Sequence, residues 1–297
     1  MNSKPLPPRY PLRKVVACVI ALGACVANAH ALQVTDDRGV TIVLERPASR
    51  IVTLAPHLAE IAFAAGAGAS LVGVSSFSNH PREARLLPVV ASNSSIDLER
   101  LIALKPQLVL AWQSGNSPLQ VARLEQLGYR VIVSEVRRLA DIPRIIRLVG
   151  TIAGREAVAD ARAGRFERAI EDLRRQRANE PGVPVFVEIW HRPMLTVNGG
   201  HLISDAIRVC GGRNVFADAK VLVPLVSREQ LLGARPQAII TGGFGSEKLQ
   251  DWSSLKSVPA IRRGRIYVID SELLQGQGPR VIEGIRAVCR QLETLPN

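Results

Sequence analysis

The sequence of 297 residues has few aromatic side chains, few cysteines and few histidines. Phe, Tyr and Trp make up 4% of it, so aliphatic side chains must build most of any interior. The few histidines leave little material for a metal site of its own, which needs three or four converging ligands. No Walker loop and no nucleophile elbow occur, and the glycine clusters lack the strand and helix context of a dinucleotide-binding turn. These gaps count against the common types of α/β enzyme.

Charge and hydropathy count against two further classes. The net charge of +12 at pH 7 is not gathered into a basic stripe with stacking aromatics, as a nucleic-acid binder requires. Residues 1–31 hold four basic residues beside an apolar run that is too short to span a bilayer, which is the pattern of an export signal. No later stretch is long and apolar enough for a transmembrane helix. We expect cleavage after Ala31, leaving a charge of +8; a lipoprotein signal with Cys25 as the lipidated residue is the alternative.

Export decides how the cysteines are interpreted. Cys210 and Cys289 remain once the signal is removed, and both lie in apolar segments of helical character. In an oxidising compartment, two such residues most simply form one disulfide, here between two helices of the C-terminal half. Two buried free thiols are the alternative.

The longest helical pattern covers residues 155–179, which are rich in helix formers and contain no proline. Its apolar residues recur at three- and four-residue steps and form one narrow stripe: Phe166, Ala169, Ile170 and Leu173. We therefore expect an α/β fold of two Rossmann-like lobes, residues 32–154 and 180–297, with parallel central sheets joined by one long rigid helix. A peripheral helix of a single domain is the alternative.

Short β-rich runs alternate with helical patterns on both sides of that helix, as in parallel sheets covered on both faces. The expected strands are residues 50–54, 71–74, 108–112, 130–134, 185–190, 238–241 and 265–270. The expected helices are residues 58–65, 98–104, 119–127, 142–154, 202–210, 228–234 and 281–292. Residues 98–110 and 228–240 match without a gap, each as helix, proline and strand. The same unit thus occurs once in each lobe, and a ligand is expected in the crevice at the carboxyl ends of the strands.

A family resemblance covers nearly all of the chain from residue 50 onward. The matching segments are residues 54–56, 60–66, 72–78, 98–106, 111–112, 115–116, 209–216 and 226–230. Together they resemble the periplasmic binding proteins of ABC importers for vitamin B12, haem and ferric siderophores, most of all the cobalamin-binding members. The resemblance implies a monomeric receptor in the periplasm without a cofactor of its own. It also implies a permease and an ATPase of the inner membrane as partners, and little closure on ligand binding.

Two glutamates match positions that dock the receptor in this family. There, one acidic residue on each lobe meets arginines of the membrane permease, and Glu99 and Glu229 occupy the matching positions. They are also equivalent in the internal repeat, each at the start of an expected helix. The alternative is that each glutamate is there only because the helix macrodipole favours an acidic residue in the first turn.

Aromatic residues suggest the ligand contacts. The resemblance places Phe77 and Trp112 where aromatics line the corrin site of the cobalamin-binding members, and aromatic faces suit a flat macrocycle. The sequence departs from that pattern elsewhere, with Asn93 and Val223 in place of tryptophans and residues 271–273 in place of an Asp-Trp pair. Trp190 is a further candidate contact. For Phe77 and Trp190 the alternative is a place in the core.

His57 is another departure, because the cobalamin-binding members have a small residue at this position beneath the ligand. A neutral imidazole is a good axial ligand for cobalt or iron, so His57 is a candidate ligand to a metal that the bound molecule carries. With His191 it could face that molecule from opposite lobes, an arrangement that would favour haem. The alternative is that His57 caps the following helix or bonds a loop.

The sequence therefore predicts an exported solute-binding protein, not an enzyme, that captures cobalamin or a related corrinoid between its lobes. Haem is the second candidate ligand and a ferric siderophore the third. An exported α/β enzyme is the alternative from a different class.

Overall fold

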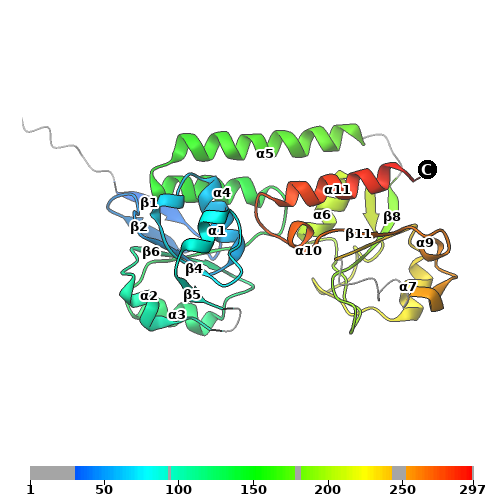
Figure 1. The fold of residues 1–297 in the computed structure, drawn as a ribbon, viewed down its shortest axis with the longest axis horizontal. Helices are drawn as coiled ribbons and strands as arrows, with labels where there is room; N and C mark the ends of the chain where they lie inside the picture. The colour runs from blue at the N-terminus through cyan, green and yellow to red at the C-terminus, as the bar shows by residue number, and fades with distance from the viewer. Residues whose placement is uncertain (1–30, 93–94, 178–181, 243–251, 296–297) are drawn as a thin grey trace, which may run out of the picture. The chain divides into compact units, whose positions relative to one another are not determined.

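Two parallel sheets organise the computed structural model, which describes residues 31–92, 95–177, 182–242 and 252–295 (Figure 1). The strand order is β5-β4-β3-β6-β7 in the first sheet and β11-β10-β8-β9 in the second. We call the parts around them the N-terminal and the C-terminal lobe. The strands are β1 (Leu32–Thr35), β2 (Thr41–Leu44), β3 (Ile51–Thr53), β4 (Leu71–Ser75), β5 (Val89–Ala91), β6 (Leu108–Trp112), β7 (Val131–Ser134), β8 (Val183–Glu188), β9 (Gly212–Asn214), β10 (Ala238–Thr241) and β11 (Ile266–Val268).

Helices follow most of the strands, which confirms the predicted α/β class. The α-helices are α1 (Pro56–Ala64), α2 (Leu98–Ala103), α3 (Pro118–Gln126), α4 (Asp141–Ala153), α5 (Glu156–Gln176), α6 (Leu202–Val209), α7 (Arg228–Ala234), α9 (Pro259–Arg262), α10 (Ser271–Leu274) and α11 (Val281–Glu293). Short 3₁₀ turns are η1 (Gly68–Ser70), η2 (Arg82–Leu86) and η3 (Trp252–Leu255). None of the helices in the described ranges is long and apolar enough to cross a membrane. The export signal, with Cys25, and also Asn93 lie outside the described residues.

Alternating side chains of the strands point to opposite faces and enter different core clusters. In β3, Ile51 packs in a cluster with α1 and α4, whereas Val52 packs in a second cluster with Leu101 of α2 and Leu124 of α3. Both faces of the N-terminal sheet are therefore covered, which is why its strands are continuous aliphatic runs. The first cluster continues through α5 into the C-terminal lobe, where it includes β8, α6 and α11.

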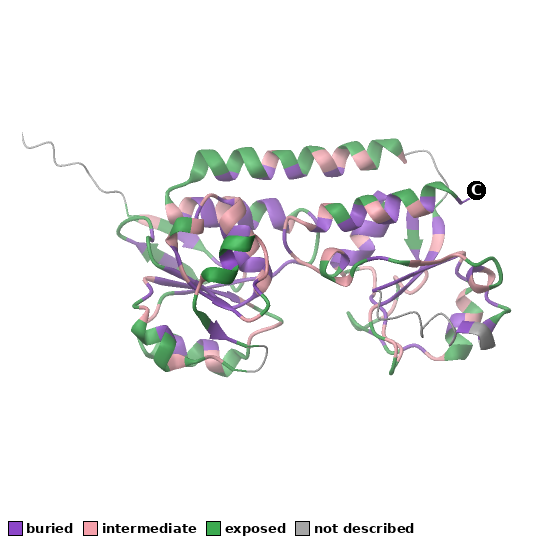
Figure 2. Ribbon diagram, viewed as in Figure 1, coloured by how far each residue is buried: buried purple, intermediate pink, exposed green. Residues whose placement is uncertain are grey.

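The long helix α5 packs against α4 in the N-terminal lobe and against α6 and α11 in the C-terminal lobe. Its 21 residues would extend about 32 Å. The opposite side of the helix is exposed over most of its length (Figure 2). Four side chains are buried along one stripe: Ala159, Ala163, Phe166 and Ile170. The expected helix of residues 155–179 is thus largely present, with Arg155 as its N-cap residue. Ala178 and Asn179 lie outside the described residues.

The internal repeat is present in three dimensions. α2 leads to β6, and α7 leads to β10, and each of these two strands lies inside its sheet. In both copies the basic residue before the proline has a left-handed backbone, with φ 46° at Lys105 and φ 48° at Arg235. Non-glycine residues seldom adopt this conformation, so its recurrence shows that the two connections are built alike.

The sequence patterns missed four strands of three or four residues, whereas the equally short β3 and β11 fall within longer runs that were predicted. β5 and β9 have three residues each, and β1 and β2 form a separate antiparallel hairpin of four-residue strands. Runs of this length carry too little periodicity to separate a strand from a loop. Helix α1 also begins two residues earlier than expected, because Pro56 starts the helix as well as ending the strand region. That shift places His57 inside the first helical turn.

The predicted disulfide is present. Cys210 follows α6 directly and is bonded to Cys289 of α11, with 79 residues of separation along the chain. Both residues are buried in the core cluster that spans the two lobes. The bond therefore ties together two of the helices against which α5 packs.

Replacing both cysteines by alanine (C210A/C289A) should lower the free energy of unfolding by about 2–4 kcal/mol, because closing a long loop restricts the unfolded chain. Equilibrium urea unfolding followed by circular dichroism measures the change. A reducing agent should cause a similar loss in the unmodified protein and none in the double variant. Equal stability of the two proteins would contradict a stabilising role for this bond.

Candidate ligand-binding cleft

Loops at the carboxyl ends of the strands line two adjoining cavities. One has a volume of about 320 Å³ and the other of about 290 Å³, and they share Trp112, Gln275 and Gln277. Residues of both lobes line each cavity. We refer to the two together as the cleft. Its position agrees with the rule that open α/β sheets bind ligands beyond the carboxyl ends of their strands.

The floor of the cleft contains two rings from the switch point of the N-terminal sheet. The chain runs outward from β3 through β4 to β5 and then returns to β6 on the other side of β3. His57 follows β3 and Trp112 ends β6, so the reversal brings them side by side. Their ring centroids are 5.2 Å apart and their planes meet at 87°, an edge-to-face contact.

Trp112 is held by the segment that follows it. The side-chain oxygen of Asn116 accepts a hydrogen bond from the Trp112 amide at 2.7 Å, and its amide group donates to the carbonyl of Leu54 at 3.0 Å. A Cβ atom on Gly115 would lie 1.7 Å from Cε3 of the indole, so the ring occupies space that only glycine leaves free. The indole Nε1 atom is buried and has no hydrogen-bond partner in the described part of the chain.

His57 is buried in the first turn of α1, with 8% of its surface exposed. Burial disfavours the charged imidazolium and lowers the pKa of His57 to about 3, so the ring is neutral at physiological pH. Its Nε2 atom is buried and finds no hydrogen-bond partner among the described residues. The N-cap residue of α1 is Ala55, and His57 is the second residue of the helix. The alternative that His57 is the cap of this helix is therefore wrong.

Phe77 lies on the rim of the same cavity. Its backbone is left-handed, with φ 63°, and 70% of its surface is exposed. A large apolar side chain with this exposure is not a core residue, so the alternative that Phe77 fills the core is wrong. The structure thus brings His57, Phe77 and Trp112 to one cavity, as the sequence suggested.

The structure does not bring His191 to the cleft. His191 lines a different cavity, of about 300 Å³, beside Trp252 and Arg228. Its Nδ1 atom pairs with the buried carboxylate of Glu188, whose other oxygen accepts a hydrogen bond from Thr241 at 2.7 Å. His57 and His191 therefore do not face one cavity from opposite lobes in this structure. Trp190 is 51% exposed and its indole donates to the Arg192 carbonyl, so it is not a core residue either.

An ion pair and a histidine–carboxylate contact connect the lobes at the edge of the cleft. Glu60 of α1 lies 3.7 Å from Arg280, and His80 lies 3.8 Å from Glu272. Burial raises the pKa of Glu60 to about 7, although the nearby Arg280 opposes this rise. The Glu60 carboxyl group is therefore close to half protonated at neutral pH.

Sequence patterns missed several polar residues of the cleft. Gln275 and Gln277 follow α10, and His201 caps α6 by accepting from the Ile203 amide. Ser114 donates from its hydroxyl to the buried carboxylate of Glu135 at 2.7 Å, which joins the loops after β6 and β7. These residue types are common in loops and do not by themselves indicate a binding site. The signal that could have found Ser114 and Glu135 is their position just after a strand.

Glu99 and Glu229 lie in the first turns of α2 and α7, and both are exposed. The helices are capped by Asp97 and by Ser227, respectively. The Ser227 hydroxyl lowers the pKa of Glu229, which keeps its carboxylate ionised. The two carboxylates are thus equivalent in position, as the repeat predicted; their docking role stays a prediction.

Comparison with known proteins gives a consistent result. A family model described as periplasmic binding protein matches residues 51–273. The vitamin B12-binding protein of Vibrio cholerae is 34% identical over 248 residues, which cover 83% of this chain and 90% of that protein. The crystal structure of the periplasmic vitamin B12 binding protein of Vibrio cholerae matches with a TM-score of 0.76 at 34% identity, over 83% of this chain and 97% of that one. The periplasmic heme-binding protein RhuT from Roseiflexus sp. RS-1 matches with a TM-score of 0.71 at 25% identity, over 82% of this chain and 97% of that one.

The buried, neutral state of His57 predicts a pH dependence of stability. Because its pKa is lower in the folded state, the unfolded chain alone gains this proton below pH 6.5, and the free energy of unfolding falls as pH falls toward 3. Between pH 7.5 and 5.0 the unmodified protein should lose about 2 kcal/mol more than the His57→Asn variant. Urea unfolding at both pH values measures this difference. Parallel losses in the two proteins would contradict a buried neutral imidazole.

Proposed function

Since the chain belongs to the periplasmic binding protein family, we propose that it captures cobalamin or a related corrinoid in the cleft and delivers it to a membrane permease. One observation carries this proposal. Phe77 and Trp112 line one cavity at the strand ends of a chain that is 34% identical to a vitamin B12-binding protein over 83% of its length.

The cleft has the chemistry that a corrinoid requires. Its ring system is broad and nearly flat, so exposed aromatic faces such as that of Phe77 bury a large area of it at little cost in conformational entropy. Amide groups surround the ring, and they can exchange hydrogen bonds with the side chains of Gln275 and Gln277, which line both parts of the cleft. A few placed polar groups within a mainly apolar wall give orientation as well as affinity.

His57 is the proposed contact to the metal that the ligand carries. Its low pKa keeps the imidazole lone pair free of a proton, as coordination to cobalt or iron requires. The unpartnered Nε2 atom is consistent with this role. Because that atom is buried, direct coordination requires a shift of the side chains that cover it. Without such a shift, His57 supports the aromatic floor under the ligand.

Haem is the second candidate ligand, and its support is the similarity to a periplasmic heme-binding protein at 25% identity. The separate positions of His57 and His191 do not supply a pair of axial ligands. A haem complex would therefore use His57 alone or a different ligand.

Titration of the purified exported protein with cyanocobalamin, cobinamide and haemin distinguishes these candidates. We expect corrinoid binding with one-to-one stoichiometry and micromolar or tighter affinity by calorimetry, and recovery of the ligand chemically unchanged. A haemin spectrum of low-spin type that disappears in the His57→Ala variant, without corrinoid binding, would replace cobalamin by haem. A chemically altered ligand would indicate an enzyme.

We further propose that the receptor acts as a monomer in the periplasm, with an ABC permease and its ATPase as partners. Cleavage of the signal after Ala31 would release it, whereas lipidation of Cys25 would anchor it. The mass of the exported protein decides between the two. Trp190 stays a candidate ligand contact on the C-terminal lobe, to be tested by alanine substitution in the same titration, whereas His191 lines a different cavity.

The Gly115→Ala variant should weaken cyanocobalamin binding without unfolding the protein. The new methyl group collides with the indole and displaces Trp112 from the cavity wall. Loss of an aromatic anchor commonly weakens the free energy of binding by more than about 1.4 kcal/mol, so the affinity for cyanocobalamin should fall about tenfold or more. Calorimetry measures the affinity. Gly233→Ala is the matched control, because its Cβ would meet open space; equal affinity in both variants would contradict a role of Trp112.

Reversing charge at both proposed docking glutamates (E99R/E229R) should abolish uptake of cobalamin into cells while leaving the affinity for cobalamin unchanged. Charges at a rim act mainly on encounter and registration of the partner. The double variant E45R/E83R changes two other exposed glutamates and is the matched control. Uptake assays with labelled cobalamin and calorimetry measure the two effects, and persistent uptake in E99R/E229R would show that docking does not depend on these residues.

A further inference from the structure

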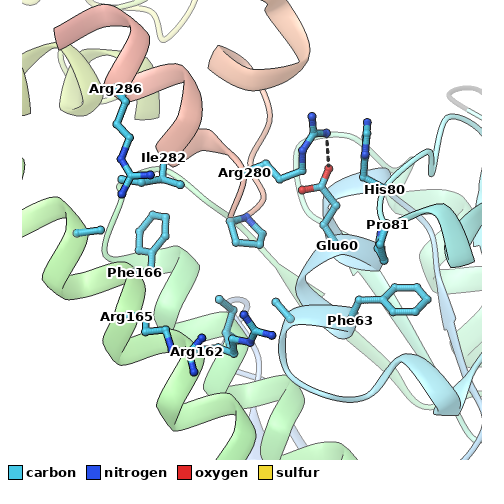
Figure 3. Close-up of a pocket in the computed structure, with 14 residues that line it drawn as sticks. Glu60, Phe63, His80, Pro81, Arg162, Arg165, Phe166, Arg280, Ile282 and Arg286 are labelled. Carbon is cyan, nitrogen blue, oxygen red and sulfur yellow. Dashed lines mark ion pairs between the residues drawn. The ribbon is translucent and has the colours of Figure 1, made fainter. Parts of the chain in front are cut away.

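A larger cavity lies beside the cleft, on the α5 side of the interlobe ion pair. Its volume is about 700 Å³, it is open to solvent, and residues of α1, α4, α5 and the start of α11 line it. Figure 3 shows Glu60 and Arg280 paired on one side of it and residues of α5 on the other. Glu60, His80 and Arg280 line both this cavity and the cleft, so the two spaces adjoin at these three residues.

One part of the cavity wall is apolar. Phe63 comes from α1, Ile146 from α4, Phe166 and Ala169 from α5, and Ile282 from α11. Phe166 is buried, and Ala169 and Ile282 are half-buried. Such a wall gains free energy when an apolar group displaces the water that covers it.

The wall also carries four arginines. Arg162 and Arg165 of α5 and Arg286 of α11 line it, together with Arg280. Among the described residues, no acidic side chain forms an ion pair with the first three, whereas Arg280 pairs with Glu60. The acidic residues of α5 that form ion pairs do so elsewhere: Asp160 and Glu167 with Arg147, and Glu171 with Arg174 and Arg175.

The cavity therefore keeps a net positive charge next to an apolar surface. Glu60 is the one acidic residue among its described lining residues. Its carboxyl group already faces Arg280, and burial raises its pKa to about 7, which reduces its negative charge. Among the described lining residues, no acidic group other than Glu60 offsets the charge of the α5 arginines.

We propose that this cavity binds an amphipathic organic anion, such as a carboxylate or phosphate monoester with an apolar chain. The head group lies among Arg162, Arg165 and Arg286, where guanidinium groups can bind two oxygens at once. The chain lies against Phe166 and Ile282. A small inorganic anion would leave the apolar wall in water, and an amphipathic cation would be repelled by the arginines.

Calorimetry with three probes tests the proposal: sodium decanoate below its micellar concentration, decyltrimethylammonium and inorganic phosphate. Decanoate should bind the exported protein with a stoichiometry of one, phosphate much more weakly, and the cation not at all. Saturation with cyanocobalamin should leave decanoate binding intact, because the arginines and apolar residues proposed to hold decanoate do not line the cleft. No binding of decanoate, equal binding of phosphate, or loss of decanoate binding under cyanocobalamin would each overturn the proposal.

Paired substitutions locate the site. The R165Q/R286Q variant should bind decanoate about tenfold more weakly, since two charge-assisted contacts are removed. The R168Q/R290Q variant removes the same charge from the same two helices at positions that do not line the cavity, so its affinity should be unchanged. Circular dichroism confirms that both variants are folded. Equal weakening in both would show that binding follows net charge, and the site would be rejected.

Discussion

Packing of one helix against both lobes is the constraint on which the rest of the structure depends. α5 contacts α4 on one side and α6 and α11 on the other, and its buried residues belong to a core cluster that continues through both lobes. The two sets of strand ends are therefore related through a continuous apolar interior and not through a flexible linker. The disulfide strengthens the C-terminal part of this arrangement, because it joins α6 to α11. The cleft is the space that remains where the two lobes do not touch.

The two lobes share a plan but differ in the chemistry of their switch points. Each has a histidine shortly after its central strand, yet the two rings behave differently. Thr53 pairs with Leu110 in the N-terminal sheet, and Val187 pairs with Ile240 at the equivalent place in the C-terminal sheet. The next residue along the chain is Leu54 in the first case and Glu188 in the second. The Glu188 carboxylate holds His191 within its own lobe. The corresponding Leu54 offers no carboxylate to His57, and the Nε2 atom of His57 has no hydrogen-bond partner among the described residues. Both rings lie edge-to-face against a tryptophan, His57 against Trp112 and His191 against Trp252.

Much of the fold could be predicted from the sequence because its signals are long or repeated. The 130-residue repeat located the central units, uninterrupted helix formers located α5, and export predicted the bond between Cys210 and Cys289. Phe77 and Trp112 were assigned to one cavity by resemblance, and the structure brings them together. The edge strands β5 and β9 were too short for a periodic signal.

Membership of a cavity was harder to predict than secondary structure. Gln275 and Gln277 reach the cleft because a loop of the C-terminal lobe faces the N-terminal one, and no local pattern encodes that. His191 was expected beside the ligand, but its pairing with Glu188 depends on a strand residue whose importance the sequence did not reveal. The arginines of α5 resembled an ordinary solvated helix face. Their position opposite α11 shows that Arg162 and Arg165 share a cavity with Arg286.

The scarcity of aromatic residues gives the molecule an optical property. Its three tryptophans occupy three environments: Trp112 in the cleft, Trp190 largely exposed and Trp252 buried. Indole emission depends on solvent contact and on nearby quenchers, so the three should contribute differently to the overall emission. A coloured guest in the cleft would lie closest to Trp112 and would quench its emission most strongly. The intrinsic fluorescence of this chain thus reports occupancy of the cleft without an added label.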